Sequence, residues 1–228
     1  MPFIHDPEFG DRMITLMAAL VLVLQILAVG QRWLMGNIRI FGLQSFLLAA
    51  IAGTIAFFNH ANHVYIVALL TLILKAVVLP LILARLVERV GIQKEIEPLI
   101  NVPLSVLISG CLTMVGYVVA ESFYHPEETS GVAALGRNTL AIAIALFLIG
   151  FFMLLNRRKA LTQVLALLSM ENGIFLAGIS LTYGVPLVIE LGIFFDVFVA
   201  VMVLAILVYR IGETFDSMDV SKLRRLRG

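Results

Sequence analysis

Four ionisable side chains lie within long apolar segments of this sequence: Lys75, Glu171, Glu190 and Asp196. A charged group inside hydrocarbon is costly unless it faces a partner or a wet cavity, so such residues mark ion or proton pathways by default. Carboxyl groups and an amine bind and release protons, and no nucleophile–base pair accompanies them. Proton transfer is therefore the chemistry that this set of residues favours.

Three of the four residues are expected at one depth. Lys75, Glu171 and Asp196 each lie about nine to eleven residues into a predicted span, which at about 1.5 Å per residue places them near the middle of a membrane. A lateral proton relay through these three residues is our interpretation. The alternatives are a structural ion pair for Lys75 and a protonated, hydrogen-bonded carboxyl group for Glu171 and Asp196. Glu190, only four residues after Pro186, is either an entry or exit point of the path or a solvated residue at the rim.

Neighbouring residues are expected to support this site. Asn172 adds a hydrogen-bonding amide beside Glu171, and Gly173 permits close approach of another backbone. Pro80 follows Lys75 by five residues and predicts a kink that frees a backbone carbonyl. Such a kink would widen a polar pocket around Lys75.

The elements that must position these residues are membrane-spanning helices. Of the 228 residues, 61% are hydrophobic and 14% are charged, whereas a soluble domain is about 45–50% apolar. A helix needs roughly 20 apolar residues to cross hydrocarbon about 30 Å thick. The sequence predicts one all-α transmembrane domain over residues 1–228, with seven spans at about 13–30, 38–58, 64–86, 99–120, 135–156, 162–183 and 186–209.

The basic residues predict the orientation of these spans. One side of the predicted topology holds thirteen of the sixteen: Arg32, Arg39, Arg85, Arg89, Lys94, Arg157, Arg158, Lys159, Arg210, Lys222, Arg224, Arg225 and Arg227. Because cytoplasmic loops are enriched in lysine and arginine, the N-terminus is expected outside and the C-terminus in the cytoplasm.

Cysteine and histidine usage argues against a cofactor in this chain. Cys111 is the single cysteine, which excludes an internal disulfide and a multi-cysteine cluster, and we expect it to be a small buried residue of a helix. All four histidines fall outside the predicted spans, without metal-ligand spacing. We therefore expect no metal site, no active site and no nucleic-acid partner; the lipid bilayer is the environment.

Three motifs resemble a known membrane subunit. Residues 74–82 (LKAVVLPLI), 170–173 (MENG) and 188–196 (VIELGIFFD) are similar, in order and spacing, to hydrogenase-4 component E. That family belongs to formate hydrogenlyase-type, energy-converting group 4 nickel–iron hydrogenase complexes. The resemblance covers most of the chain from the second span onward.

Residues 157–228 also resemble the small K subunit of respiratory NADH:quinone oxidoreductase (complex I) and the C subunit of multi-subunit sodium/proton antiporters. In those subunits a glutamate in each of two helices belongs to a central hydrophilic axis. The resemblance assigns these positions to Glu171 and, with aspartate in place of glutamate, to Asp196. The shorter aspartate implies a nearer or water-bridged partner.

The resemblance implies a non-catalytic subunit that helps to couple redox chemistry to proton or sodium translocation in a bacterial or archaeal inner membrane. Its implied partners are antiporter-like and quinone-module-like membrane proteins and a peripheral hydrogenase arm. The nickel–iron centre and iron–sulfur clusters would reside in those partners. The alternatives are a subunit of a cation/proton antiporter, a stand-alone secondary transporter, which would usually show two similar halves, and a purely structural assembly subunit.

Overall fold

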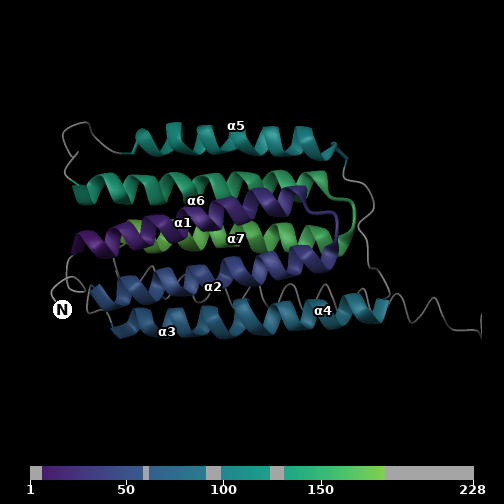
Figure 1. Cartoon of the computed structure of the whole chain (residues 1–228), viewed down its shortest axis with the longest axis horizontal. Helices are drawn as coiled ribbons and strands as arrows, with labels where there is room; N and C mark the ends of the chain where they lie inside the picture. The colour runs from purple at the N-terminus through teal and green to yellow at the C-terminus, as the bar shows by residue number, and fades with distance from the viewer. Residues whose placement is uncertain (1–6, 59–61, 91–98, 124–130, 183–228) are drawn as a thin grey trace, which may run out of the picture. The chain divides into compact units, whose positions relative to one another are not determined.

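The computed structural model describes residues 7–58, 62–90, 99–123 and 131–182. All regular structure within these ranges is helical (Figure 1). The elements are α1 (Pro7–Gly30), α2 (Leu34–Phe58), α3 (Asn62–Thr71), a π-helix (Leu72–Val78), α4 (Leu79–Val90), α5 (Val102–Glu121), α6 (Gly131–Asn156) and α7 (Ala160–Thr182). The predicted seventh span, with Glu190 and Asp196, lies outside the described residues.

Six of the described segments are long and apolar enough to cross a membrane. They are Phe9–Gly30, Leu34–Phe58, Val64–Glu88, Val102–Glu121, Arg137–Asn156 and Leu161–Ile179. These ranges match the first six predicted spans to within a few residues, and α3, the π-helix and α4 together form the third. The all-helical, multi-pass character of the chain is therefore confirmed for the part that the structure describes.

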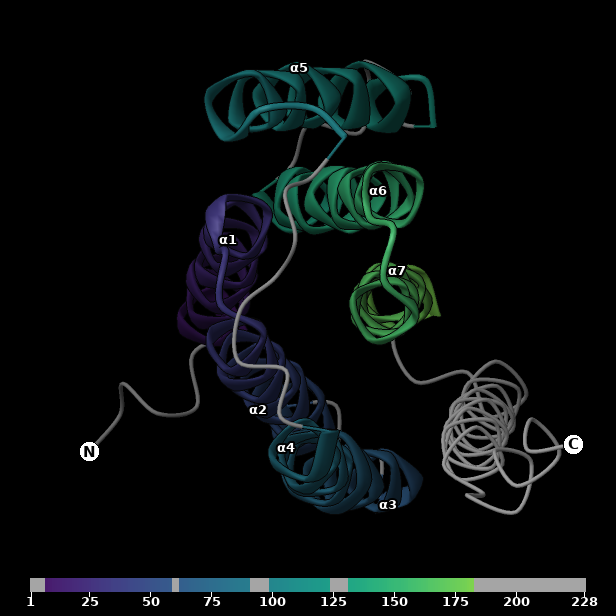
Figure 2. The same cartoon turned by 90° about the vertical axis from the view of Figure 1, so that its right-hand side faces the viewer.

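The helices pack in two connected groups. Helix α6 contacts α5, α7 and α1, and α2 contacts α1, α7 and the third span. Figure 2 shows α6 between α5 and α7, and α2 beside α1. The core between them contains apolar side chains from five helices, among them Val21, Leu48, Val67, Leu146 and Leu176. Helices α1, α2, α3, α6 and α7 thus share one hydrophobic core.

Glycines bring α6 and α7 close together. A Cβ atom on Gly173 of α7 would lie 2.6 Å from the backbone nitrogen of Phe147, and one on Gly150 of α6 would lie 2.7 Å from the Cα atom of Met170. Small residues allow such close packing of helices within membranes, where van der Waals contact replaces the hydrophobic driving force. Gly173 therefore has the close backbone approach that its type predicts.

The third span changes its helical repeat around Lys75. Residues Leu72–Val78 form a π-helix, and the backbone N–H of Leu79 donates to the carbonyl of Leu74, five residues earlier. Pro80 has no N–H to continue the α-helical pattern with Ala76. The Ala76 carbonyl and the Pro80 ring instead face Gly42 of α2, where a Cβ would meet them at 3.5 and 3.3 Å. The irregularity predicted from Pro80 is thus a π-helix.

The loop between α6 and α7 is tied to α1 through a buried cation. Arg157, only 3% exposed, donates from a guanidinium nitrogen to the carbonyls of Ala28 and Val29, at 3.4 and 3.0 Å. These carbonyls belong to the last turn of α1, which lacks helical partners and carries the negative end of the helix dipole. Arg157 therefore caps a distant helix rather than facing water as a loop residue.

The expectation for Cys111 is wrong, because its side chain is exposed on α5. Helix α5 packs through a narrow stripe that contains Ser105, Ser109, Gly116 and Ala120. Cys111 follows Ser109 by two residues, about 200° around the helix, and so lies on the other side. The hydropathy of Cys111 does not indicate which face of α5 packs against the other helices.

Candidate functional site

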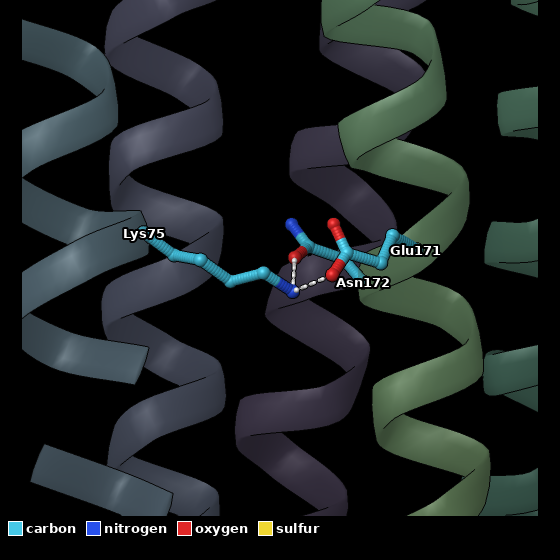
Figure 3. A network of polar contacts seen from close by, with 3 residues as sticks. All are labelled: Lys75, Glu171 and Asn172. Carbon is cyan, nitrogen blue, oxygen red and sulfur yellow. Dashed lines mark hydrogen bonds and ion pairs between the residues drawn. The ribbon is translucent and has the colours of Figure 1, made fainter. Parts of the chain in front are cut away.

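Lys75 and Glu171 form an ion pair inside the bundle. The Nζ atom of Lys75 lies 3.2 Å from Oε1 of Glu171, and the two side chains are only 3% and 2% exposed (Figure 3). Both residues lie near the middle of their spans, Val64–Glu88 and Leu161–Ile179. The structure thus joins the third span to α7 through opposite charges near the middle of both segments.

Two further groups surround the lysine ammonium. The Oδ1 atom of Asn172 accepts a hydrogen bond from Nζ at 3.4 Å, beside the Glu171 carboxylate (Figure 3). The ring of Phe175 lies with its centroid 5.3 Å from Nζ, within the range of a cation–π interaction. An amide dipole, a π-face and a carboxylate together replace the water that the ammonium loses on burial.

The helical repeat explains why α7 can present these groups together. Glu171, Asn172 and Phe175 follow at steps of one and three residues, so they share one side of α7. Ser169 and Gly173, four residues apart, share the opposite side, where Gly173 packs on α6. One face of α7 therefore presents polar groups to Lys75, and the opposite face packs closely against α6.

Buried polar atoms close to the pair have further bonding capacity. The Nδ2 atom of Asn172 and the hydroxyl of Thr71, one turn before Lys75, have no hydrogen-bond partner among the described residues. Buried donors and acceptors normally find a partner, either protein or water. These two atoms could bind water molecules or a polar group of another subunit.

The structure thus brings together Lys75, Glu171 and Asn172, and it places Pro80 at the end of the π-helix that carries Lys75. Asp196 and Glu190 lie outside the described residues. The Lys75–Glu171 pair can hold a shared proton on either partner, since transfer from Nζ to Oε1 converts an ion pair into two neutral groups. Whether it acts as a relay stays a prediction.

Sequence reasoning missed a second buried polar cluster, the Gln25 cluster, formed by Gln25 of α1, Gln44 of α2 and Ser169 of α7. The Gln25 Oε1 atom accepts hydrogen bonds from the Ser169 hydroxyl and from Nε2 of Gln44, the latter at 2.9 Å. All three side chains are buried. Their only sequence signal is an uncharged amide within an apolar span, which is much weaker than a charge.

Comparison with known proteins identifies relatives of this chain. It is 24% identical over 219 residues to hydrogenase-4 component E of Escherichia coli, and the match covers 96% of this chain and 99% of that protein. The same figures hold for hydrogenase-4 component E of Shigella flexneri. The chain is thus a homologue of hydrogenase-4 component E over nearly the whole length of both proteins. It is therefore a multi-pass membrane protein related to a hydrogenase subunit.

Two other comparisons match most or part of the chain. An uncharacterized protein of Mycobacterium tuberculosis is 34% identical over 203 residues, covering 89% of this chain and 90% of that protein. The family model of NADH-ubiquinone/plastoquinone oxidoreductase chain 4L matches residues 138–228, which include most of α6, all of α7 and Glu171. No solved structure matches the chain. The carboxyl-terminal part of this component E homologue is thus similar to a complex I subunit.

Proposed function

We propose that the chain is a non-catalytic integral subunit of a complex I-like group 4 nickel–iron hydrogenase or formate hydrogenlyase complex in a bacterial or archaeal cytoplasmic membrane. Its role there is to carry protons, or to couple sodium movement, along an intramembrane hydrophilic axis. The observation that carries the proposal is the Lys75–Glu171 ion pair, which is buried at the middle of two spans. The similarity to hydrogenase-4 component E and to chain 4L supports a place among other membrane subunits.

Proton movement would begin within the pair. A proton leaves Nζ of Lys75 for Oε1 of Glu171, which produces a neutral amine and a neutral carboxylic acid. Both products are easier to accommodate in hydrocarbon than separated charges. Glu171 then passes the proton onward, with Asp196 as the proposed acceptor, and Lys75 takes the next proton. Asn172 keeps the amine in place during the exchange through its Oδ1 atom.

Redox chemistry is assigned to partner chains in this proposal. The nickel–iron centre and the iron–sulfur clusters belong to a peripheral hydrogenase arm, and antiporter-like and quinone-module-like proteins flank this subunit in the membrane. Lys75 and Glu171 would respond to events in those partners. With the N-terminus outside, Arg158, Lys159 and the basic residues of the carboxyl-terminal tail would face the cytoplasmic arm.

The test is a Glu171→Gln substitution in the whole complex, reconstituted into closed vesicles. Glutamine keeps the side-chain volume but cannot carry a proton, so we expect proton translocation to fall about 100-fold or more, the scale of a lost acid–base group. Hydrogen-dependent redox turnover is measured separately on the same vesicles. Glu88→Gln is the matched control, because Glu88 is an exposed carboxylate at the end of the third span.

The outcomes separate the rival functions. Normal translocation in Glu171→Gln would leave the ion pair a purely structural role and overturn the proposal. Sodium-dependent translocation that is lost with Glu171 would favour the antiporter-like role over proton conduction. Translocation by the purified chain alone, without partner subunits, would indicate a stand-alone transporter.

A further inference from the structure

The Gln25 cluster lies on the opposite side of α7 from the Lys75–Glu171 pair. Ser169 precedes Glu171 by two residues, so its side chain leaves the helix about 200° away from the carboxylate. Its hydroxyl donates to Oε1 of Gln25, whereas the Glu171 side faces Lys75. Helix α7 is therefore held by polar contacts on two opposite sides within four residues.

Gln25 connects four helices. Its Oε1 atom accepts from Ser169 of α7 and from Nε2 of Gln44 of α2, and its Nε2 atom donates to Sδ of Met153 on α6 at 3.4 Å. Gln44 also donates to the carbonyl of Val21, one turn earlier on α1, at 3.4 Å. Gln25 is 0% exposed, so no water competes with these contacts. Both polar atoms of the Gln25 amide thus form hydrogen bonds to neighbouring helices.

An amide is a poor proton carrier, because its nitrogen and oxygen hold their protonation state near neutral pH. The Gln25 cluster is therefore suited to fixing the positions of the helices and not to conducting protons. Geometry matters at this place, since misplacement of reacting groups by 1 Å costs on the order of 100-fold in rate. The contact that fixes α7 against α1 lies only about 3 Å along the helix from Glu171.

We propose that Gln25 and Ser169 are positioning residues for Glu171. Through the Ser169 hydroxyl they fix the rotation of α7 and thereby the separation of the Glu171 carboxylate from the Lys75 ammonium. The inference rests on the proposed function for its consequence in translocation, but the positioning itself is measurable without it.

The test compares Ser169→Ala with Ser109→Ala in the intact complex in lipid vesicles. Ser109 is also a buried serine of a membrane helix, but its hydroxyl donates to the Ser105 carbonyl of its own helix, at 2.9 Å. The two substitutions remove the same atoms, and only one of them breaks a contact between helices. Ser169→Thr keeps the hydroxyl and is the rescue variant.

The primary readout is the infrared carboxyl band of Glu171, which is identified as the band that disappears in Glu171→Gln. We expect Ser169→Ala to shift this band and to move the pH profile of translocation, with about a tenfold lower rate at the optimum. Ser109→Ala should leave both unchanged, and Ser169→Thr should restore them. A purely structural role would lower the amount of assembled complex without moving either readout.

Gln25→Leu provides a second, independent variant. It retains the approximate volume but removes both polar atoms, and it should shift the Glu171 band in the same way. An unshifted band in both Ser169→Ala and Gln25→Leu overturns the positioning role. Normal translocation in Glu171→Gln overturns the proposed function instead, and in that case a shifted band in Ser169→Ala still supports the positioning.

Discussion

At the scale of the residue, the pairing of Lys75 with Glu171 offsets the energetic cost of placing charged side chains in an apolar segment. Lys75 and Glu171 are each nearly inaccessible, and each supplies the counter-charge that the other requires. A buried pair of this kind is weak evidence for stability, because desolvation offsets most of the attraction. Its presence near the middle of two apolar spans therefore argues for a role other than holding the fold.

This reasoning predicts different effects for single and double substitutions. Lys75→Met alone leaves Glu171 without its cation, and we expect a loss of about 3–5 kcal/mol of stability unless Glu171 becomes protonated. The double variant Lys75→Met with Glu171→Leu should recover most of that loss and still fail to translocate protons. Thermal unfolding of the solubilised protein and translocation in vesicles measure the two effects. A double variant as unstable as the single would show that the pair is chiefly structural.

Arg157 gives a second prediction at this scale. Its guanidinium donates to two carbonyls at the end of α1, so Arg157→Leu should lower stability by about 1.5–3 kcal/mol, the range for hydrogen bonds to a charged group. Arg158→Leu, at an exposed neighbouring position, is the control and should have little effect. Equal unfolding temperatures for the two variants would contradict this assignment.

At the scale of the element, much of the fold is predictable from hydropathy. Runs of apolar residues located the first six spans because each had to cover the same thickness of hydrocarbon. Hydropathy did not locate the polar first turns of α1, which begins at Pro7, nor the π-helix at Leu72–Val78. Both depend on local backbone bonding, which leaves the apolar character of a segment unchanged.

The candidate site was predictable to the same degree. Charges in apolar segments identified Lys75 and Glu171 individually, since their cost in hydrocarbon is large. Their contact depends on how the third span and α7 pack, which no local pattern specifies. Gln25 and Ser169 were not predicted as site residues. Uncharged polar residues cost less free energy in hydrocarbon than charged ones, and they occur in membrane helices in many structural roles.

The glycine contacts between α6 and α7 can be tested as an element-scale prediction. Gly173→Ala places a Cβ against the backbone of α6, which cannot move as a side chain would, so a loss of about 1–3 kcal/mol is expected. Gly110→Ala is the matched control, because a Cβ there meets nothing within 4 Å. It should be neutral or stabilising through helix propensity. A smaller effect at Gly173 than at Gly110 would contradict the close packing.

Pro80 provides a prediction about the π-helix. Pro80→Ala restores an N–H that can bond the Ala76 carbonyl, so the third span should relax toward a regular α-helix. That change would rotate Lys75 away from Glu171 and reduce translocation, while expression and stability hold. Unchanged translocation together with an unchanged Glu171 infrared band would show that the π-helix does not depend on Pro80.

At the scale of the whole molecule, the distribution of basic residues predicts its orientation in the membrane. A phosphatase that is active only outside the cytoplasm, fused within residues 124–130, should be active, whereas fusions after Arg158 or at the C-terminus should be inactive. A fluorescent protein that folds only in the cytoplasm should give the reverse pattern. An active phosphatase at the C-terminus would exclude the predicted seventh span.

The sequence separations of the buried polar contacts also bear on how the protein is made. Lys75 is 97 residues from Asn172, Val29 is 128 from Arg157, and Gln25 is 144 from Ser169. A ribosome therefore delivers α1, α2 and the third span to the membrane before any of these partners exists. Nascent chains truncated before residue 157 should be retained by the insertion machinery or degraded, so that synthesis of α7 becomes the step that releases the finished subunit.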